Sequence, residues 1–417
     1  MPRTRLILSV NAGSSSIKLS LYSASFGSTP VLLVKSSVSG LTSPPAKFSY
    51  SNNGNKGHNI EDRESGDVTD QGSALELFLK HLGQDDSLKG HGAGEIELAV
   101  HRIVHGGLFS EAVVLSKETI QEIEHLTDLA PLHNAAALAL VKLATQRLPK
   151  VVNIAYFDTT FHTRSISPHV YTYPLDPGMA QKKMIRKYGF HGISYSFVLR
   201  EAVEFLQKPA EETSLISLHL GSGASAAAIR NGKSIDTTMG LTPLEGLPGA
   251  TRSGSIDPCL VFHYTSNASS LARSSTKELH ISIAEDILNK QAGWYSMVGT
   301  TDFGKVVQGT HDGDEKMKLV FDLFVDRIVG YIGNYFVKLG GKVDALTFSG
   351  GIGERSEDLR RAVIDKVACL GFKLDDSSGN TDSNGAVTRL GPKVLLIKTN
   401  EEFEMAQECA QDKRFWE

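Results

Sequence analysis

Two Gly/Ser-rich turns of similar pattern lie half a chain apart in this sequence of 417 residues. The first is in LILSVNAGSSSIKLSLY, residues 6–22, and the second in LISLHLGSGASAAAIRNGKS, residues 215–234. In each, an apolar run typical of a β-strand enters the turn and an alternating run leaves it, which predicts a hairpin with small residues at its tip. Backbone N–H groups at such a tip can bind oxyanions. The repeat therefore predicts two related α/β halves that hold a polyphosphate, and it indicates phosphoryl transfer.

Composition fits two ordinary domains. The length gives each half enough residues for its own core, and 41% hydrophobic with 22% charged residues is typical of globular proteins. The 43 basic and 47 acidic residues give a net charge of −4. Nucleic-acid binding usually needs a basic excess, so we expect no nucleic-acid partner.

Cysteine usage and hydropathy indicate the compartment. Cys259, Cys369 and Cys409 are odd in number and lack metal-site spacing, which favours a reduced compartment. No apolar run approaches a membrane span, and the one after Arg5 is shorter than a signal peptide needs. We expect a cytoplasmic protein without membrane contact.

Helical and β-type stretches alternate along the chain, as in α/β proteins. Three stretches rich in small polar residues are expected to be surface segments, the first of them a long hairpin or loop: 41–72, 264–280 and 375–385. The apolar patterns predict helices from 73, at 117–127 and at 134–148, and strands within 96–107 and 153–162.

A third glycine-rich turn occurs in DALTFSGGIGERS, residues 344–356. We expect a strand to deliver Gly350, Gly351 and Gly353 to a helix that begins near Ser356, where N–H groups could face a nucleotide. Taken alone the glycines are equally explained as packing devices. Three such turns in one chain favour the phosphate interpretation.

Two near matches to a P-loop are rejected. GTTDFGKV, residues 299–306, has the glycine and lysine spacing, but Val306 replaces the Ser or Thr that would hold magnesium. NGKS, residues 231–234, lacks the upstream glycine. Neither predicts a nucleotide site of that type.

Polar side chains that could take part in binding or catalysis gather in short segments. HRIVHGG contains Arg102, whose guanidinium suits a carboxylate or phosphate, although a structural ion pair is the commoner role of an arginine. His101 and His105 have zinc-helix spacing in what is predicted to be strand and turn, so metal binding is not expected there. DLAPLHN places His133 before a helix that Asn134 could cap.

Three further segments complete the set. FDTTFH offers Asp158, which could equally be a turn aspartate, and YGFHGISY offers His191, which could equally be a core histidine. Residues 236–258 combine Gly, Thr and Pro with the single Arg252, which is typical of an ordered active-site loop.

These motifs together resemble the acetokinase family, in its fungal form, within the superfamily of actin-like and sugar-kinase ATPases. The resemblance covers nearly the whole chain, through VNAGSSSIK, HRIVHGG, DLAPLHN, FDTTFH, YGFHGIS, HLGSGAS, TPLEGLPGATRSGSIDP, FSGGIGE and TNEE. It implies an enzyme that interconverts acetate and ATP with acetyl phosphate and ADP, using Mg²⁺ or alternatively Mn²⁺, and a homodimer.

The resemblance also implies a fold. The fold is α/β, with duplicated ribonuclease H-like (actin-like ATPase) domains and an active-site cleft between them. The N-terminal domain would comprise 1–158 and 402–417, and 159–401 would form a C-terminal domain that binds nucleotide and makes the dimer.

Site residues follow from the same resemblance. Asn11 and Glu401 would hold the metal, although Glu401 also fits an ordinary acidic helix start. Asp158, His191 and Arg252 would be catalytic. The substrate would be bound by Arg102, Val104, Leu132, His133, Phe190 and Pro243. The nucleotide and its phosphates would be bound by Ser14, Ser16, Lys18, His219, Leu220, Gly221, Ser222, Gly223, Asp302, Phe303, Gly351, Ile352, Gly353, Glu354 and Arg355.

Proton chemistry constrains the role of Asp158. The family assigns this aspartate as acid or base, but acetate resembles a carboxyl side chain with a pKa near ~4 and carries no proton to remove at neutral pH. Positioning of substrate or of metal-bound water fits better. Alignment and charge neutralisation by Arg102, His191, Arg252 and the metal are what phosphoryl transfer needs.

Two positions depart from the family pattern. Ser222 stands where Asn is usual, and Gly304 stands where Arg is usual. Both belong to the nucleotide side, so pyrophosphate as donor is one alternative, and a propionate or butyrate kinase is another. A non-enzymatic actin-like scaffold is a third alternative, which would not need Arg102, Asp158, His191 and Arg252.

Overall fold

The computed structural model describes residues 3–13, 16–41, 44–54, 57, 59–88, 91–126, 131–264, 267–275, 281–375 and 385–417, with the backbone alone for 131–133 and 135. Its contacts divide the chain into two compact units. Unit 1 comprises Met1–Thr160 and Asn400–Glu417, and unit 2 comprises Phe161–Thr399.

Unit 1 is built on an eight-stranded mixed sheet in the order β5-β4-β3-β2-β1-β6-β8-β7. Its strands are β1 (Thr4–Ala12), β2 (Ser16–Ser25), β3 (Val31–Ser39), β4 (Ala46–Asn52), β5 (Ile60–Ser65), β6 (Ile96–Ile103), β7 (Val113–Val114) and β8 (Val152–Phe157). β1 pairs antiparallel with β2 and parallel with β6, and β6 pairs parallel with β8. The carboxyl ends of β1, β6 and β8 therefore meet at one edge of the sheet.

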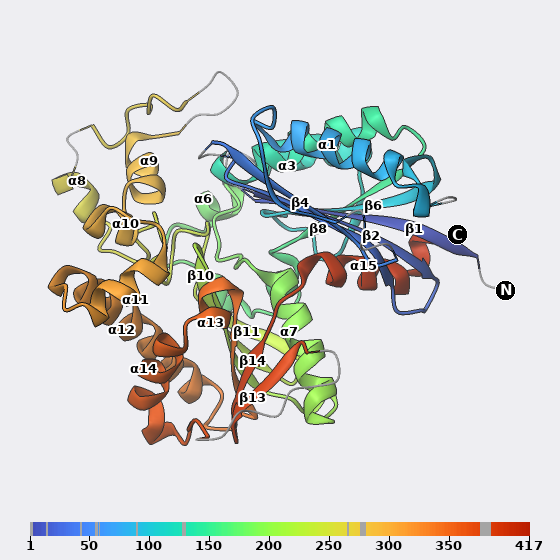
Figure 1. Ribbon diagram of the computed structural model, residues 1–417. Coiled ribbons are helices and arrows are strands. Elements are labelled where there is room, and N and C mark those ends of the chain that lie inside the picture. Colours follow the sequence, from blue (N-terminus) through green and yellow to red (C-terminus); the bar gives the residue numbers. More distant parts are fainter. Residues whose placement is uncertain are drawn as a thin grey trace. The chain divides into compact units, whose positions relative to one another are not determined.

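Helices cover both faces of this sheet (Figure 1). They are α1 (Gln71–Gln84), α2 (Lys117–Leu126), α3 (Pro131–Arg147) and α15 (Glu401–Gln411), with short 3₁₀ turns at Asp86–Leu88, Ala93–Glu95 and Lys413–Phe415. α1 and α3 contact the sheet from one side and α15 from the other. Seven consecutive residues of β1 are buried, as expected for a strand that is covered on both faces.

Unit 2 repeats the plan with a six-stranded sheet in the order β11-β10-β9-β12-β14-β13. Its strands are β9 (Leu215–Leu220), β10 (Ala224–Arg230), β11 (Lys233–Thr237), β12 (Ala345–Ser349), β13 (Val387–Gly391) and β14 (Val394–Ile397). β9 pairs antiparallel with β10 and parallel with β12, which pairs parallel with β14. In this core of five strands the order is third, second, first, fourth, fifth, and β3-β2-β1-β6-β8 has the same order. The predicted duplicated α/β fold is confirmed.

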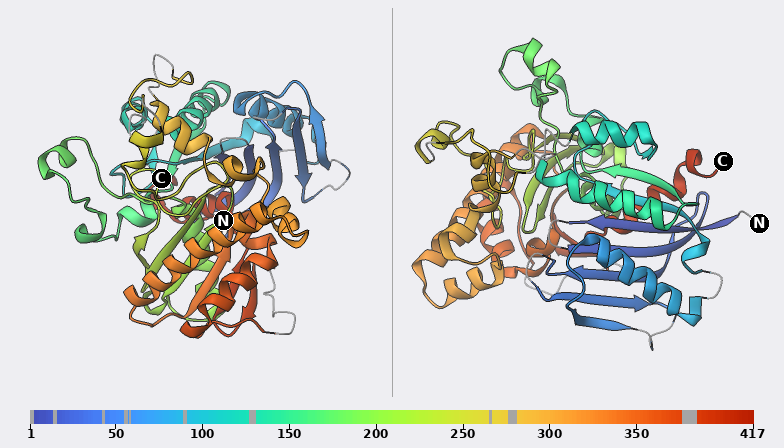
Figure 2. Two further views of the ribbon diagram at one scale, coloured as in Figure 1. Left: turned by 90° about the vertical axis from the view of Figure 1, so that its left-hand side faces the viewer. Right: turned by 90° about the horizontal axis from the view of Figure 1, so that it is seen from above.

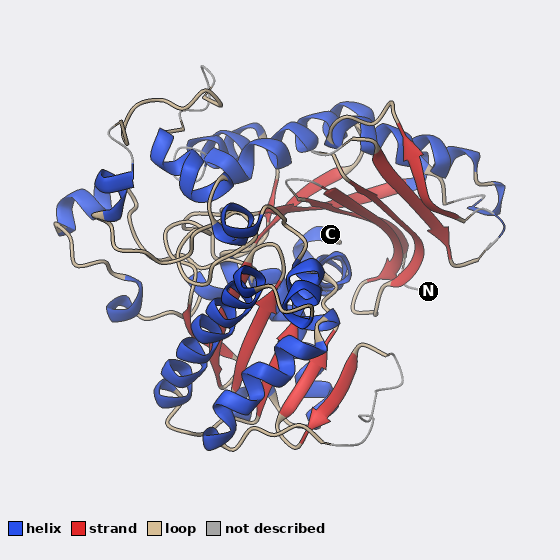
Figure 3. Ribbon diagram, turned by 60° about the vertical axis from the view of Figure 1, so that its left-hand side comes forward, coloured by secondary structure: helices blue, strands red, loops and turns tan. Residues whose placement is uncertain are grey.

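Helices of unit 2 flank its sheet, as Figure 3 shows. They are α5 (Pro168–Tyr171), α6 (Pro177–Lys182), α7 (Gly192–Leu206), α8 (Leu260–Tyr264), α9 (Ile283–Lys290), α10 (Gly293–Val298), α11 (Phe303–His311), α12 (Glu315–Lys338), α13 (Gly350–Arg355) and α14 (Glu357–Val367), and α4 (Thr160–Thr163) spans the boundary; 3₁₀ turns lie at Ala210–Glu212 and Ala368–Leu370. α12 contacts β9 and β10, and α7 contacts β9, β13 and β14. The segment with α5 and α6 extends away from the sheet of unit 2 (Figure 2, green).

Most expected elements are present, with three differences. Both Gly/Ser turns join antiparallel strands, as predicted. Residues 46–52 and 60–65 form the two paired strands of a hairpin at the sheet edge, as predicted, and the second strand is largely exposed. The first strand belongs to the core instead of the surface, because Phe48 and Tyr50 are buried. α3 begins at Pro131 instead of 134, and α13 begins at Gly350, ahead of the helix predicted near Ser356. Most of 375–385 lies outside the described residues.

No helix among the described residues combines the length and apolar character of a membrane span.

Candidate active site

Charged and amide side chains of unit 1 meet at the carboxyl ends of β1, β6 and β8. Arg102, the penultimate residue of β6, donates from Nε to Asp158 Oδ1 at 2.9 Å and from a terminal nitrogen to Asp158 Oδ2 at 2.7 Å. Its other terminal nitrogen donates to Asn11 Oδ1 at 3.0 Å and lies 3.9 Å from Glu401 Oε2. Asn11 in turn donates to Glu401 Oε2 at 2.7 Å and to Glu402 Oε1. We call these five residues the charged cluster.

Burial strengthens the electrostatic interactions within the charged cluster. Asp158 is fully buried, and the side chains of Arg102 and Glu401 are 14% and 9% exposed. Burial opposes the charge of the Arg102 guanidinium, but Asp158, Glu401 and Glu402 more than offset this effect and raise its pKa. Arg102 is therefore a permanent cation that Asp158 orients through two hydrogen bonds and that Glu401 and Glu402 stabilise through their charge.

The first Gly/Ser turn brings Asn11 to this cluster. Asn11 is the penultimate residue of β1, and the Gly13 N–H donates to the Ser16 carbonyl at 2.8 Å to close the turn. This N–H is used within the hairpin, and the tip residues 14 and 15 lie outside the described residues, so the expected oxyanion site stays a prediction. Lys18 is half-exposed and lies 4.0 Å from Glu402, and Ser14 lies outside the described residues.

The loop after β6, residues 104–107, which we call the HGG loop, is fixed by two close contacts and by the side-chain amide of Asn134. A Cβ at Gly106 would meet Phe157 at 2.4 Å, and Gly107 has φ +52° and packs on Leu126, so both positions need glycine. The Asn134 side chain accepts from the His105 N–H at 2.9 Å and donates to the His105 carbonyl at 2.8 Å. Asn134 was expected to cap a helix. It lies inside α3 and instead holds this loop, because the helix begins three residues earlier.

The other substrate residues predicted in unit 1 are only partly described. Val104, in the HGG loop, is half-buried. Leu132 and His133 lie in the first turn of α3, and their side chains are outside the described residues. His101 bonds Asn153 at 2.8 Å, and burial lowers its pKa to about 4, so it is a neutral histidine of the core.

His191 of unit 2 has a strained backbone and a held ring. Its φ of 59° and ψ of 21° are left-handed, which is uncommon for a residue other than glycine and is typical of functional sites. It is the N-cap residue of α7, and its Nδ1 lies 2.8 Å from Ser225 Oγ. Ser225 Oγ also lies 2.6 Å from the hydroxyl of Tyr195, one turn along α7.

A second imidazole stacks on His191. The ring of His219 lies 4.1 Å from it, centroid to centroid, at 24°. His219 Nδ1 is 2.7 Å from Ser194 Oγ, which is 2.8 Å from Thr399 Oγ1. We call His191, His219, Ser194, Ser225, Tyr195 and Thr399 the hydroxyl–imidazole network.

His162 supports the segment that leads into His191. Its Nε2 donates to the Phe190 carbonyl at 3.0 Å and its Nδ1 lies 2.8 Å from Ser234 Oγ, and burial lowers its pKa to about 4. The buried Phe190 thereby has its backbone fixed, with its ring in the interior. Only glycine fits at position 189, because φ is +79° and a Cβ there would collide with Thr237 and His162.

The loop expected to carry Arg252 packs on the second Gly/Ser turn. A Cβ at Gly223 would lie 2.1 Å from an Arg252 terminal nitrogen, so the guanidinium rests directly on the turn. Arg252 donates to the carbonyl of the buried Pro243 at 3.1 Å, and the Ala250 N–H donates to the Ser222 carbonyl at 2.8 Å. Within the turn, the Gly221 N–H donates to the Gly223 carbonyl at 3.1 Å.

The third glycine turn lies against the end of β9. Gly350 has φ +77°, and a Cβ there would meet the Leu220 carbonyl oxygen at 2.7 Å. Glu354 Oε1 accepts from the N–H groups of Gly350 at 3.1 Å and Thr399 at 3.2 Å. Of the remaining residues predicted here, Gly351 accepts from the exposed Arg355, Gly353 is buried, and Ile352 packs on the core.

Asp302 and Phe303 have different surroundings. Asp302 caps α11 by accepting from the Gly304 N–H at 2.9 Å. The Phe303 ring is buried against Trp294 and Phe324, so its side chain belongs to the core of unit 2.

Sequence reasoning missed several residues of these two groups. Glu402, Ser225, Tyr195, Ser194 and Thr399 were not predicted as site residues. The TNEE motif contains two adjacent glutamates, which could have indicated Glu402. The hydroxyl residues carry no local signal, because their role depends on strand register and on how α7 packs.

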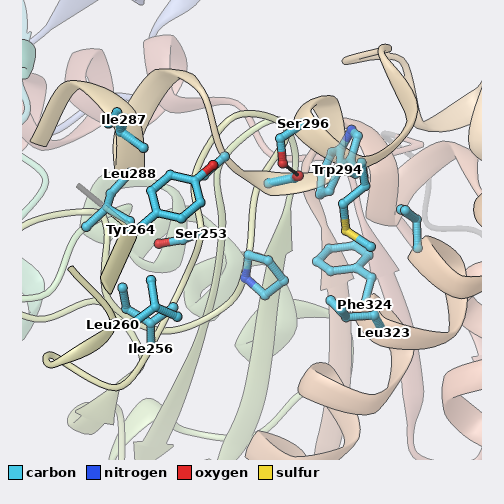
Figure 4. A pocket seen from close by; sticks show the side chains of 15 residues that line it. Ser253, Ile256, Leu260, Tyr264, Ile287, Leu288, Trp294, Ser296, Leu323 and Phe324 are labelled. Atoms are coloured by element: carbon cyan, nitrogen blue, oxygen red, sulfur yellow. Dashed lines mark hydrogen bonds between the residues drawn. The ribbon is translucent and has the colours of Figure 1, made fainter. Parts of the chain in front are cut away.

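An apolar pocket of about 250 Å³ lies in unit 2 on the loop that carries Arg252. It is lined by Ser253, Ile256, Leu260, Tyr264, Trp294 and Phe324 among others (Figure 4). These residues are not those of the hydroxyl–imidazole network. None of the described residues that line the pocket is Asp, Glu, His, Lys, Arg or Cys.

Comparison with known proteins agrees with these observations. The model of the acetokinase family matches residues 6–407. A probable acetate kinase of Emericella nidulans is 51% identical, over 99% of this chain and 98% of its own.

Solved structures give the same picture. A propionate kinase from Francisella tularensis has a TM-score of 0.80 at 32% identity, and an acetate kinase from Porphyromonas gingivalis has 0.75 at 30%. Each similarity covers 97% of this chain and 98% of the other. The chain, with its duplicated sheets and its arginine-centred cluster, belongs to the acetokinase family.

Proposed function

We propose that this protein is an acetate kinase, which transfers the terminal phosphoryl group of ATP to acetate and forms acetyl phosphate and ADP, reversibly. The observation that carries the proposal is the orientation of Arg102. Three of its five N–H groups are bonded to Asp158 and Asn11, and each terminal nitrogen has one further N–H. Such a pair suits the two oxygens of a small carboxylate.

Asp158 orients the arginine in this proposal. Both of its carboxylate oxygens accept from Arg102. Acetate, with a pKa near ~4, presents no proton for a base to remove at neutral pH. The hydrogen bonds therefore support a positioning role over general base catalysis.

Asn11 and Glu401 fit a magnesium site. Mg²⁺ prefers carboxylate and amide oxygens and usually takes only one or two carboxylates from the protein, with waters and substrate phosphates completing its shell. Asn11 and Glu401 are hydrogen-bonded neighbours with such oxygens. Among the described residues no group of three or more His, Cys, Asp or Glu is placed to hold a metal ion. When bound, the ion would neutralise phosphate charge, and Mn²⁺ could substitute.

Unit 2 would supply the residues that contact the nucleotide and those that contact the transition state. Arg252 lies on the Gly221–Gly223 turn, where a guanidinium can neutralise a transferring phosphoryl group. His191 would donate a hydrogen bond to the same group. Glu354 and the turn around Gly350 adjoin the end of β9 and are proposed to hold the nucleoside.

The methyl group of the substrate is proposed to contact Val104, Leu132, Phe190 and Pro243. One extra methylene changes discrimination by only ~1–3 kcal/mol. The similarity to a propionate kinase structure makes propionate the main alternative acceptor.

A hydroxylamine trap for acyl phosphate tests the proposal. Purified protein with Mg²⁺ is given acetate, propionate or butyrate, and ATP or pyrophosphate. Acetate-selective product with ATP, absent in Arg102→Ala and Arg252→Ala, is the expected result. Product with pyrophosphate alone would change the donor, and no product from a folded protein that binds ATP would favour the scaffold alternative.

We also propose a homodimer formed through unit 2. Leu260, Phe262 and Tyr264 on α8 are 41%, 74% and 64% exposed, beside the pocket of about 250 Å³, and such an apolar face usually marks an interface. Light scattering should give twice the chain mass, and Phe262→Glu should halve it. Val337→Glu, at an exposed apolar position of α12, is the matched control and should stay dimeric.

A cytoplasmic location is proposed from the free thiols of Cys259, Cys369 and Cys409. Cell fractionation tests it.

A further inference from the structure

The interior side of His191 carries an ordered pair of hydroxyl groups. Ser225 Oγ lies 2.8 Å from His191 Nδ1 and 2.6 Å from the Tyr195 hydroxyl. Ser225 and Tyr195 are both fully buried. A serine hydroxyl has one proton to donate and two lone pairs to accept with, so the direction of these two bonds decides which nitrogen of His191 carries a proton.

Tyr195 determines that direction. Burial raises its pKa well above the ordinary value, so the phenol keeps its proton. The Ser225 hydroxyl and the backbone of His219 both bond this hydroxyl, and both bonds lower its pKa. A backbone group that lowers the pKa of a phenol must be an N–H donor, so the phenol oxygen accepts from His219, whereas a serine hydroxyl can also accept from the neutral phenol. The phenol proton is then directed to Ser225 Oγ.

Ser225 must pass its own proton onward. With one lone pair accepting from Tyr195, its O–H points to His191 Nδ1. A neutral imidazole that accepts at Nδ1 carries its proton on Nε2. The sequence of donors is therefore Tyr195, then Ser225, then His191, and it ends in an N–H on the opposite side of the ring.

We propose that Ser225, backed by Tyr195, is a positioning residue that fixes His191 as the Nε2–H tautomer and so presents a preset hydrogen-bond donor to the transferring phosphoryl group. The inference rests on the proposed function for the identity of the acceptor. The left-handed backbone of His191 and the stacked ring of His219 hold the same orientation. A donor that is already oriented needs no reorganisation during transfer.

The tautomer can be read directly by long-range ¹H–¹⁵N correlation spectra of protein labelled in histidine, with His191 assigned from His191→Gln. Wild-type protein at pH 8 should show His191 protonated at Nε2. Ser225→Ala should give a mixture of tautomers, and Tyr195→Phe should give a smaller shift in the same direction. Wild-type His191 protonated at Nδ1 would overturn the proposal.

Ser194→Ala is the matched control for the spectrum. Ser194 lies on the same helix as Tyr195, and its hydroxyl bonds the neighbouring ring of His219. The substitution should change the His219 signals and leave those of His191. An equal change at His191 would mean that the hydroxyl groups act through general packing, which contradicts the proposal.

Kinetics test whether the tautomer matters. Ser225→Ala should lower kcat by ~10-fold or more, below the ~10²–10³-fold expected for loss of the whole donor, with KM for acetate and ATP nearly unchanged. In a His191→Ala background the same substitution should have no further effect, because Ser225 acts through the ring. An equal loss in both backgrounds would overturn the proposal. If wild-type protein forms no acyl phosphate, the proposed function fails, while the spectra still report the tautomer.

Discussion

The two Gly/Ser hairpins contribute residues to two sites of different chemistry. The β1–β2 hairpin delivers Asn11 to a charged cluster in which Arg102 is paired with buried carboxylates. The β9–β10 hairpin delivers His219 and Ser225 to a hydroxyl–imidazole network. One backbone plan thus serves a site that depends on charge and a site that depends on the direction of hydrogen bonds. Substitutions in the charged cluster should therefore lower stability strongly, whereas substitutions in the hydroxyl–imidazole network should have smaller effects.

Removal of Arg102 should have the largest effect. Arg102→Ala leaves Asp158 buried without its cation, which costs ~3–5 kcal/mol of stability, and activity should fall by at least ~10²-fold. Arg252→Ala should lose similar activity, because its guanidinium on the Gly221–Gly223 turn is proposed to neutralise the transferring phosphoryl group. Urea denaturation and kcat/KM measure both. Wild-type stability in Arg102→Ala would show that the charged cluster does not depend on its cation.

Arg102→Lys sharpens the same comparison. It keeps the positive charge and loses the paired bonds to Asp158, so its stability should lie between wild type and Arg102→Ala. Wild-type activity in Arg102→Lys would show that charge alone suffices.

Gly223→Ala should have the next largest effect. The added Cβ would lie 2.1 Å from the Arg252 guanidinium, so the arginine must move, and a displacement near 1 Å can cost ~10²-fold in activity. Gly330→Ala in α12, where a Cβ meets nothing within 4 Å, is the control and should be neutral or slightly stabilising. Full activity in Gly223→Ala would show that Arg252 tolerates displacement.

Acid should destabilise both units by a smaller amount. Burial lowers the pKa of His101 in unit 1 and of His162 in unit 2 to about 4. Since the unfolded chain binds a proton near pH 6.5 and the folded chain does not, the stability from each histidine is complete above pH 6.5 and is lost as pH falls toward 4. At pH 5.5 each should cost roughly 1.4 kcal/mol.

Urea denaturation at pH 7.5 and 5.5 checks this loss. His101→Gln and His162→Gln should each reduce the difference between the two pH values by about one histidine's share. A variant with an unchanged difference would show that the histidine it lacks is charged in the folded protein.

The local structure of both hairpins was predictable because small residues between two β-type runs leave few alternatives. The start of α13 was not, since glycines usually precede a helix, whereas here Gly350 enters it at a close approach to Leu220. The polar composition of the β4–β5 hairpin predicts an exposed segment and gives no sign that two of its aromatic residues, Phe48 and Tyr50, are buried.

The site was predictable where a motif carries charged residues and less so elsewhere. Asn11 and Glu401 are 390 residues apart, and only the family resemblance linked them. Ser225 and Tyr195 are ordinary residues of a strand and a helix. Their role follows from the register of β9 with β10, which sets Ser225 opposite His219, and no sequence pattern reports it.

Restoring the family residues at Ser222 and Gly304 should have the smallest effect. Both positions are exposed, Ser222 at the tip of the hairpin and Gly304 in the first turn of α11. Exposed polar contacts contribute ~0.2–1 kcal/mol, so Ser222→Asn and Gly304→Arg should lower KM for ATP by only about 1.5- to 5-fold and leave KM for acetate unchanged. A change of 100-fold, or a switch of preferred donor between ATP and pyrophosphate, would show that the nucleotide side depends on its exposed rim, and unit 2 would then be governed by charge as unit 1 is.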